Sequence, residues 1–528
     1  MISAVRARAE ADPSGIALAD DVGTRTWAEV ADDLERAAGA LLTVAPGPAQ
    51  RVSVTGENAI PTLEAHAAAL TVGVGTVATG RTLSAGELAD QYADAGVVCA
   101  IAGRDSLAAV RAAAGAQAGP RTLVVHGLAG QWADSPDGGV PDGGVPDGVL
   151  RWPDWLRSAP PVPQDAGQRP PRPLLVYTSG TTGRARGAEV RWTVTLPRTA
   201  AEYVAAITAE SSFPAGPHLV AGPLQHNAPL TSVRHLLAGQ PVIIAGRFDA
   251  EEILWLIEKH GVTSTVMVPT HFQRLLALPA RVRDRYDVSS LRLVSQTGSA
   301  CPAGAKLAMI DWFGPVLVES YGGSESGTLC RIDSTEWLAH RGSVGRPRAP
   351  FEAVVLDSGG QPLGPGAVGV LGFRAPPDRG PRYHADPEKT ASAYVAPGVF
   401  TLGDVGYVDE DGYVYITDRV ADMVLSGGVN LYPAESEQVL VTHPAVAEVA
   451  VIGVPHPDLG ESMLALIVPA GEPPDPGTLE AYCRERLAPY KVPRAYEFRA
   501  ELIYNAMGKP DKKAMRAPYW AGMRTIAG

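Results

Sequence analysis

Residues 174–190 read LLVYTSGTTGRARGAEV, an apolar strand that runs into a loop of glycine, serine and threonine. Backbone amides and hydroxyl groups in such a loop form a nest that binds anions, so the loop is suited to phosphate. It departs from the common P-loop pattern GxxxxGK[ST] and offers Arg184 and Arg186 where a lysine is usual. We therefore expect a phosphate site here, with a plain polar loop as the alternative. Its candidate ligands are Thr178, Ser179, Gly180, Thr181, Thr182, Gly183 and Arg186.

The complete string resembles a motif of the adenylate-forming superfamily, which includes acyl-CoA synthetases, peptide-synthetase adenylation domains and luciferases. Members typically carry YTSGTTGxPKG, and this chain follows that pattern until Ala185 and Arg186 replace Pro-Lys. The resemblance is specific, because further motifs follow in the family's order and cover nearly the whole chain. These motifs are GSACP (298–302), ESYGGSES (319–326), GSVGRP (342–347), TLGDVGYVDEDGYVYITDR (401–419), LSGGVNLYPAESE (425–437) and YNAMGKPDKKAMR (504–516).

The resemblance implies a binding site for the AMP moiety of ATP or of an acyl-adenylate. Tyr321 can stack on adenine, and Gly322 leaves room beside the ring. Asp404 can accept hydrogen bonds from both ribose hydroxyls. The AMP-binding residues implied in this way are Gly298, Ser299, Ala300, Tyr321, Gly322, Asp404 and Arg419.

The resemblance also implies a reaction in two steps, with Mg²⁺ as the metal and coenzyme A (CoA) as co-substrate. A carboxylate attacks the α-phosphate of ATP, which gives an acyl-adenylate and pyrophosphate, and the CoA thiol then displaces AMP. Ser324 can hydrogen-bond the α-phosphate, Glu325 is a hard oxygen ligand for Mg²⁺, and Lys509 can bridge the carboxylate and the α-phosphate. The catalytic residues implied are Lys509, Ser324, Glu325 and His226.

The segment PLQHNAPL (223–230) falls where the resembling family forms its acyl pocket, with His226 near the pocket gate. A histidine that is only packed or hydrogen-bonded is the alternative for this residue. The segment has no obvious carboxylate for an amino group, which disfavours an amino-acid substrate. Finer similarity, in 247–263 and in the terminal APYW, is to bacterial acyl-CoA synthetases of bulky acids such as bile-acid and steroid side chains. We therefore expect a bulky apolar acid, and free CoA as acceptor because no carrier domain follows Gly528.

The missing lysine leaves a second enzyme hypothesis open. Arg186 keeps the charge with a different donor geometry, while Ala185 removes the fixed φ of proline from the loop. Only adenylation needs the β- and γ-phosphates, so the chain could instead accept a preformed acyl-adenylate from a separate adenylating enzyme and carry out thioesterification alone. An aminoacyl-adenylating domain and a non-catalytic acyl- or adenylate-binding protein remain as further alternatives.

Alternating helix and strand patterns must position these residues. Residues 26–43 place apolar side chains at helical spacing, 51–58 read as a strand and turn, and the alternation continues through 85–103. Residues 63–80 are the most apolar stretch, but Glu64, His66 and several glycines indicate a buried helix and strand, not a membrane helix. The patterns predict an α/β fold: a large N-terminal domain of layered α/β subdomains and a small α+β C-terminal domain, which the resemblance implies is mobile.

A domain boundary is predicted near Asp418–Asp422, where the pattern changes to a hairpin followed by helices and strands. In the resembling family the small domain rotates between the two steps, and Ala421 occupies the position of the hinge. Gly427 and Gly428 would border the tunnel for the pantetheine arm of CoA. The predicted parts are an N-terminal adenylate- and acyl-binding domain (1–418), a hinge (419–422) and a C-terminal domain (423–528).

Composition excludes some partners. The 528 residues carry a net charge of −12, which argues against nucleic acid and against an anionic membrane surface. The four cysteines lie far apart without metal-ligand spacing, which predicts reduced thiols in a cytoplasmic protein. The N-terminus lacks an apolar signal segment. The sequence leaves the oligomeric state open, a dimer included.

Overall fold

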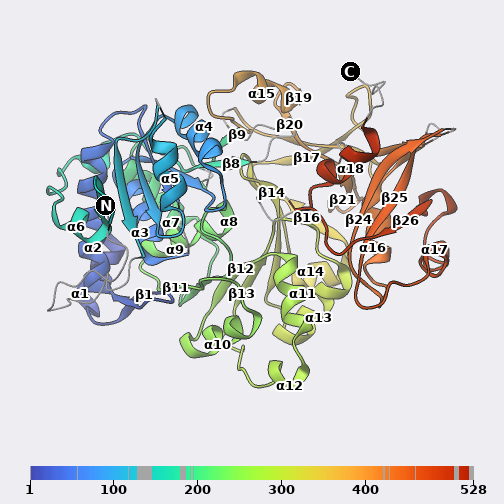
Figure 1. Ribbon diagram of the computed structural model, residues 1–528, viewed down its shortest axis with the longest axis horizontal. Helices are drawn as coiled ribbons and strands as arrows, with labels where there is room; N and C mark the ends of the chain where they lie inside the picture. The colour runs from blue at the N-terminus through green and yellow to red at the C-terminus, as the bar shows by residue number, and fades with distance from the viewer. Residues whose placement is uncertain are drawn as a thin grey trace. The chain divides into compact units, whose positions relative to one another are not determined.

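The computed structural model describes residues 2–55, 58–116, 118–127, 145–178, 186–190, 192–193, 195–377, 379–419, 422–426, 429–457, 459–504 and 510–521. The structure divides into two compact units. In Figure 1 the colour of the chain runs by residue number from blue at the N-terminus to red at the C-terminus. Unit 1 consists of Met1–Ala300, Ala308–Thr328 and Pro381–Ala391; unit 2 consists of Cys301–Leu307, Leu329–Gly380 and Ser392–Gly528. The predicted hinge at 419–422 stays a prediction, because Val420 and Ala421 lie outside the described residues.

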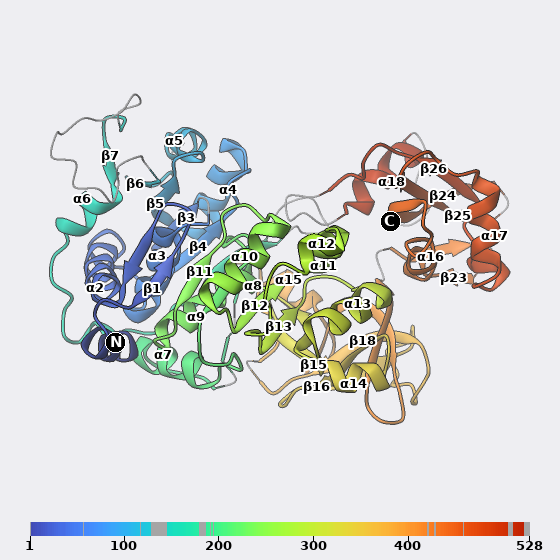
Figure 2. The ribbon, with the colours of Figure 1, turned by 90° about the horizontal axis from the view of Figure 1, so that it is seen from below.

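Unit 1 contains a seven-stranded sheet, which in order is β7 (Val149–Arg151), β6 (Thr122–His126), β5 (Val97–Gly103), β3 (Arg51–Thr55), β4 (Gly75–Thr79), β8 (Leu175–Thr178) and β9 (Arg186–Glu189). Its strands pair in parallel except β8 and β9, which are antiparallel. Alternate residues along the strands enter two separate apolar cores. Figure 2 shows α4 (Ala85–Ala95) and α5 (Leu107–Ala114) on one side of this sheet and α2 (Trp27–Val44) on the other.

Helix α3 (Ile60–Thr71) is buried along its whole length, as the apolar composition of 63–80 predicted. It contacts β3 and β4 of the seven-stranded sheet, and also α2, α7 (Ala200–Ala209) and α9 (Ser232–Leu237). Pro61 fits the first turn, where a backbone N–H has no partner within the helix. The helix therefore packs between the first sheet and helices that belong to the second.

The second sheet of unit 1 brings several strand ends to one edge. In order it contains β2 (Thr24–Thr26), β1 (Ile16–Ala19), β11 (Val242–Ile244), β10 (His218–Val220), β12 (Ser264–Met267), β13 (Leu293–Gln296) and β14 (Leu317–Gly323). All neighbours are parallel except β1 and β2. Because the carboxyl ends of parallel strands share an edge, the segments that follow β10, β12, β13 and β14 are neighbours. Short helices α8 (Asn227–Leu230) and α11 (Pro269–Ala277) follow β10 and β12. The remaining helices of this part are α1 (Ser3–Ala11), α6 (Trp152–Arg157), α10 (Ala250–His260), α12 (Ala280–Arg283) and α13 (Ala303–Phe313).

Unit 2 begins with antiparallel strands. They are β15 (Gly327–Asp333), β16 (Ser343–Pro347), β21 (Val414–Arg419), β20 (Val399–Val408), β18 (Gly369–Arg374) and β17 (Glu352–Leu356), with β19 (Tyr394–Ala396) beside β20. Helix α14 (Ser334–Ala339) connects β15 to β16. Further along the chain, α15 (Pro387–Ser392) precedes β19.

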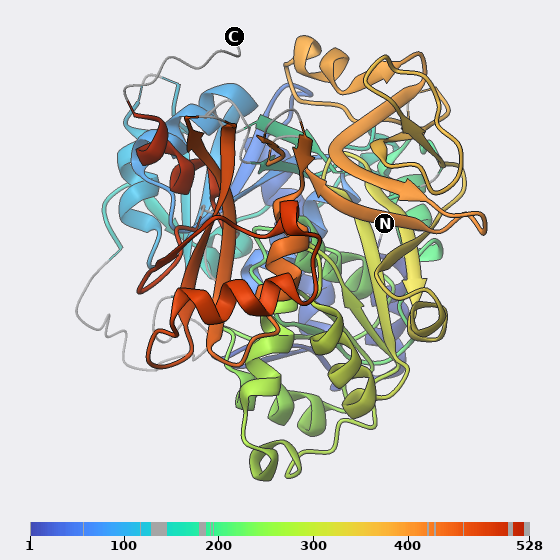
Figure 3. The same ribbon diagram turned by 90° about the vertical axis from the view of Figure 1, so that its right-hand side faces the viewer.

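The C-terminal part of unit 2 is a mixed sheet with helices on both faces (Figure 3, orange to red). Val451, Ala465 and Ile467 join α16 (Pro433–Leu440) and α17 (Pro476–Arg484) in one core, while Ile452 and Leu466 join α18 (Lys512–Trp520) in another. The strands are β23 (Val429–Leu431), β22 (Val424–Ser426), β25 (Gly460–Pro469), β24 (Val446–His456) and β26 (Ala495–Phe498).

The predicted fold class is confirmed: the chain is a mixed α/β protein with a larger N-terminal and a smaller C-terminal part. The predicted helix of 26–43, the hairpin of 422–433 and the strand after the buried helix are all present as α2, β22–β23 and β4. None of the helices in the described part of the chain is long and apolar enough to cross a membrane.

All four cysteines are free, as the sequence predicted. Cys99, Cys330 and Cys483 are buried. Burial raises the pKa of each of these thiols, that of Cys99 to about 12. Cys301 is partly exposed and follows directly after Ala300.

Candidate active site

The predicted adenine-side loop and Tyr321 lie at the carboxyl ends of two adjacent parallel strands, β13 and β14. The Thr297 hydroxyl donates to the Ser320 carbonyl over 2.9 Å and ties the two ends together. The loop is shaped by Gly298, which has φ +93°, a value that favours glycine. Gln296 Nε2 then donates to the Ser299 carbonyl over 3.0 Å. Sequence and structure thus bring the predicted adenine residues to one strand edge of unit 1.

Glu325, the predicted metal ligand, lies just past β14 on the same strand end. Its Oε1 accepts a hydrogen bond of 3.1 Å from the hydroxyl of Tyr383. Burial and the nearby carboxylate of Glu325 raise the pKa of Tyr383, so the phenol stays protonated and donates. Gly323 leaves room beside this carboxylate, because a Cβ there would lie 2.8 Å from Glu325 Oε2. Ser324 lies between these two residues, and its side chain is partly exposed.

Arg186 is the first residue of β9, where the predicted phosphate loop ends. Its Nη1 forms an ion pair of 2.7 Å with Oδ2 of Asp386. The arginine side chain is 37% exposed and the aspartate 15%, so the pair lies at the edge of the interior. The cation that replaces the usual lysine is thus already paired with a carboxylate.

The predicted acyl segment 223–230 follows β10, and Asn58 fastens it. Asn58 Nδ2 donates to the carbonyls of Gly222 and Ala245, each over 2.9 Å, and its Oδ1 accepts from Leu224 N over 2.8 Å. Trp192 Nε1 donates to Asn227 Oδ1 over 2.8 Å on the other side of His226. His226 itself precedes α8 and is partly buried.

His271 is a second histidine of this region that the sequence analysis did not single out. It lies on α11, after the carboxyl end of β12, and stacks on Phe248 with ring centroids 4.0 Å apart. Burial lowers its pKa to about 4, so the ring is neutral. A Cβ on Gly222 would lie 3.1 Å from Pro229 and 3.8 Å from His271, so both residues lie beside Gly222, which directly precedes the predicted acyl segment. The motif analysis missed it because histidine occurs mostly as a packing residue.

The predicted ribose residues Asp404 and Arg419 face each other in unit 2. They are directly opposed in the antiparallel pair β20 and β21. The Asp404 side chain is 5% exposed. Gly403 N donates to Thr401 Oγ1 over 2.9 Å and shapes the strand just before Asp404. The two positions that the sequence placed fifteen residues apart are therefore strand neighbours.

Several predicted residues lie outside the described part of the chain. They are Ser179, Gly180, Thr181, Thr182, Gly183, Ala421, Gly427, Gly428 and Lys509. The backbones of Thr178 and Arg419 are described as the ends of β8 and β21. The roles of all these residues stay predictions. Missed by the motif reading were Asn58, His271, Tyr383 and Asp386, none of which stands in a quoted motif.

Comparison with known proteins matches both parts of the chain to one family. The family model described as AMP-binding enzyme matches residues 5–377, and that described as AMP-binding enzyme C-terminal domain matches residues 435–509. The chain is 32% identical over 385 residues to the medium/long-chain-fatty-acid–CoA ligase FadD8 of Mycobacterium tuberculosis, which covers 70% of this chain and 65% of that protein.

A second relative from the same organism is 3-[(3aS,4S,7aS)-7a-methyl-1,5-dioxo-octahydro-1H-inden-4-yl]propanoyl:CoA ligase. It is 35% identical over 376 residues, and the match covers 68% of this chain and 68% of that protein. The match therefore spans about two thirds of the length of these relatives. Among solved structures, o-succinylbenzoate coenzyme A synthetase from Bacillus subtilis, in complex with ATP and magnesium ion, matches with a TM-score of 0.74 and 25% identity. That match covers 97% of this chain and 98% of the other.

Proposed function

This chain belongs to the AMP-binding enzyme family, and from that premise we propose that it joins a bulky apolar carboxylic acid to CoA through an acyl-adenylate. The observation that carries the proposal is the meeting of Gly298–Ala300, Tyr321 and Glu325 at the carboxyl ends of neighbouring parallel strands. Open α/β sheets bind nucleotides at such an edge. The similarity to two CoA ligases, of medium- and long-chain fatty acids and of an octahydro-indenyl propanoic acid, supports the same reaction class.

In the first step the acid carboxylate attacks the α-phosphate of ATP. Tyr321 stacks on adenine, Asp404 accepts from the ribose hydroxyls, and Ser324 donates to the α-phosphate. Lys509 approaches the carboxylate and the α-phosphate and offsets their repulsion. These residues hold the reacting atoms in a near-attack geometry and neutralise negative charge on the carboxylate and the α-phosphate. Positioning and charge neutralisation are the main sources of rate enhancement in reactions of phosphoryl groups.

Glu325 suits a magnesium ion. Mg²⁺ prefers oxygen ligands and usually binds through one or two carboxylates together with substrate phosphates. Glu325 has one oxygen held by Tyr383, and Gly323 leaves space beside the other. When bound, the ion would neutralise charge on the phosphates of ATP. Arg186 adds a fixed cation at the end of the loop for the β- and γ-phosphates.

In the second step the CoA thiol displaces AMP from the acyl-adenylate. We propose that Gly427 and Gly428 border the path of the pantetheine arm and that Ala421 is the hinge for a rotation of the C-terminal domain between steps. The acid would be held near His226 and the neutral His271, beside Pro229. We propose a cytoplasmic location, where the free cysteines stay reduced.

A second candidate keeps only the thioesterification of an acyl-adenylate that a separate enzyme supplies. The feature that favours it is the replacement of the Pro-Lys of the resembling family's loop motif by Ala185-Arg186. Arginine keeps the positive charge of lysine but presents its donors to a phosphate in a different geometry. Loss of Pro at position 185 would weaken the loop further.

Formation of the CoA thioester, measured by mass spectrometry in two reactions, separates the candidates. One contains a bulky apolar acid, ATP, Mg²⁺ and CoA; the other contains the matching synthetic acyl-adenylate and CoA. Thioester in both establishes a complete ligase, and thioester from the adenylate alone establishes the second candidate. A reaction without protein corrects for spontaneous acylation of CoA. With a panel of such acids, no thioester above that control in either reaction would refute both.

A further inference from the structure

We propose that Tyr383 and Asp386 are positioning residues of the phosphate site, Tyr383 for the Glu325 carboxylate and Asp386 for the Arg186 guanidinium. The inference rests on the proposed function, since it concerns the groups that would hold magnesium and the β- and γ-phosphates of ATP. One short segment, 383–390, would thus fix the orientation of two side chains, Glu325 and Arg186, that lie far apart in the sequence.

The segment is anchored to β9, directly after the phosphate loop. His384 N donates to the Gly187 carbonyl over 2.7 Å, and Tyr383 forms a β-bridge with Ala188. Gly187 is buried, and a Cβ there would lie 3.3 Å from the Cβ of His384. The backbone of the segment therefore follows the strand that carries Arg186.

The turn between the two side chains is strained. Ala385 has φ +49°, and among the described residues it is the only one other than glycine with a positive φ. This conformation is unfavourable for an L-residue and persists only where surrounding contacts enforce it. It sits between Tyr383 and Asp386, so the strained residue separates the contact to Glu325 from the contact to Arg186.

Local hydrogen bonds hold the strained turn in place. Thr390 Oγ1 accepts from Tyr383 N over 3.1 Å and donates to the Asp386 carbonyl over 2.9 Å. Asp386 Oδ1 accepts from Lys389 N over 2.8 Å, which leaves Oδ2 for Arg186. The two carboxylate oxygens of Asp386 thus have separate partners, one within the segment and one on β9.

The charges fit a supporting role. A guanidinium has five N–H donors in a fixed fork, so pairing with one carboxylate orients it and is compatible with a phosphate partner. A lysine would have a single flexible ammonium at this place. Pairing with Asp386 therefore offers one physical reason why arginine serves here. The carboxylate fixes the orientation of the guanidinium at the end of a loop that lacks the proline of the family motif.

The test is calorimetric measurement of nucleotide binding by Tyr383→Phe and Asp386→Asn in the full chain. Both changes keep side-chain shape, and the amide oxygen that Asp386→Asn introduces can still accept from Lys389 N. We expect each variant to weaken binding of ATP with Mg²⁺ about tenfold, the lower end of effects seen when outer-shell partners are lost. AMP affinity should stay within about twofold, because AMP lacks the phosphates in question.

Matched controls come from equivalent contacts elsewhere in unit 1. Tyr286 donates to Glu251 over 2.9 Å, and Asp32 pairs with Arg36 over 2.6 Å. Tyr286→Phe and Asp32→Asn remove the same kinds of contact at residues outside the predicted site, and we expect neither to change ATP or AMP affinity. A change in AMP affinity equal to that for ATP, or no change at all in Tyr383→Phe and Asp386→Asn, overturns the inference.

Two further readouts test the route of each effect. Without Mg²⁺, Tyr383→Phe should bind ATP with the same affinity as the unaltered protein, because Tyr383 acts through Glu325, the proposed metal ligand. In an Arg186→Gln background, Asp386→Asn should have no further effect on ATP affinity; independent additive losses would contradict positioning through Arg186. An unaltered protein that binds no ATP with Mg²⁺ would also overturn the inference. Failure of the proposed function appears separately, as absence of thioester from acid and from acyl-adenylate.

Discussion

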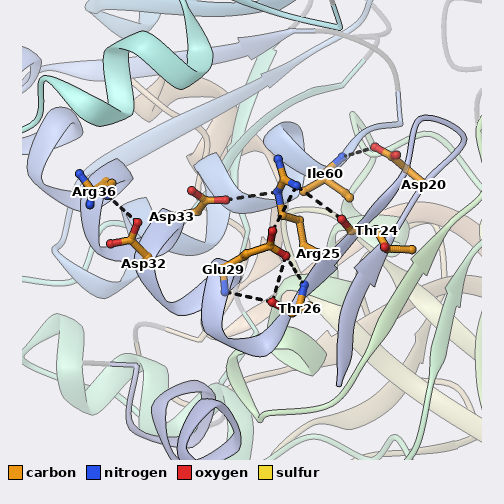
Figure 4. Close-up of polar contacts among 9 residues, drawn as sticks. All are labelled: Asp20, Thr24, Arg25, Thr26, Glu29, Asp32, Asp33, Arg36 and Ile60. Atoms are coloured by element: carbon orange, nitrogen blue, oxygen red, sulfur yellow. Dashed lines mark hydrogen bonds and ion pairs between the residues drawn. The ribbon is translucent and has the colours of Figure 1, made fainter. Parts of the chain in front are cut away.

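Glu64 carries a carboxyl group with no exposed surface in the middle of α3, and neither oxygen has a hydrogen-bond partner in the part of the chain that the structure describes. Burial, and Asp33 nearby, raise the pKa of Glu64 well above its ordinary value. Figure 4 shows Asp33 among its polar neighbours, with Arg25 reaching both Asp33 and Glu29. Glu64 is therefore protonated in the folded chain at pH values where it ionises in the unfolded chain.

The sign of the pH effect follows from this shift. Above about pH 4.5 the folded state keeps a proton that the unfolded state releases, so the Glu64 carboxyl lowers stability as pH rises, by up to about 1.4 kcal/mol per pH unit. We expect Glu64→Gln to remove this slope. The thermal unfolding midpoint of the variant, compared with the unaltered chain, should therefore improve steadily from pH 5 to pH 8. Asp33, whose pKa burial raises to about 6, adds a slope of the same sign below pH 6 in both proteins. Parallel midpoint curves would contradict the assignment.

Asp404 should act on every ligand that contains ribose. We expect Asp404→Asn to weaken ATP and AMP binding alike, each by about tenfold, because an amide offers one acceptor where the carboxylate offers two and loses the charge-assisted hydrogen bonds. This equal loss differs from the ATP-selective loss expected at Tyr383. Calorimetric titration with both nucleotides measures it, with the exposed Asp411→Asn of the same hairpin as control. A loss confined to ATP would refute the ribose assignment.

At the level of residues, motif reading named candidates only where they lie next to one another in the sequence. Gly298–Ala300 and Tyr321–Glu325 were named from contiguous strings, and Asp404 and Arg419 were placed together by resemblance. Tyr383 and Asp386 could not be named, because their partners are 58 and 200 residues distant.

Among the elements, α2 begins with a capping box (Figure 4). The Thr26 hydroxyl accepts from Glu29 N, and Thr26 N donates to Glu29 Oε2 over 2.7 Å. We expect Thr26→Ala to destabilise unit 1 by about 1 kcal/mol, the usual effect of losing an N-cap oxygen. Urea unfolding followed by circular dichroism measures it. Thr26→Ser keeps the oxygen and should restore most of the stability; equal losses in both variants would show that the cap is not the cause.

Periodicity identified elements according to how they pack. Amphipathic α2 has one polar and one apolar face, so its spacing was readable, whereas α3 is buried on all sides and was predicted from composition alone. The antiparallel return of β9 against β8 and the bridge from Ala188 to Tyr383 were not predicted. Short pairings of this kind depend on distant backbone partners, which local patterns do not encode.

For the whole molecule, the two reaction steps should respond differently to one lysine. We expect Lys509→Ala to lower acid-dependent exchange of pyrophosphate into ATP by roughly 100-fold or more, because a positioned charge is lost from the adenylation transition state. CoA thioester formation from a supplied acyl-adenylate should change only a few-fold. Kinetic assays of the two half-reactions provide the comparison, with Lys513→Ala, an exposed residue of α18, as control. Equal losses in both steps would refute a role specific to adenylation.

The distribution of thiols offers an experimental handle on the native protein. Three of the four cysteines are buried, with thiol pKa values raised by burial, whereas Cys301 is partly exposed. Cys301 is also the residue next to Ala300 of the predicted adenine loop. A maleimide fluorophore at neutral pH should therefore label this one position without any engineering. The protein would then carry an optical reporter one residue from the predicted adenine loop, and binding of a nucleotide at that loop could be followed in real time from its emission.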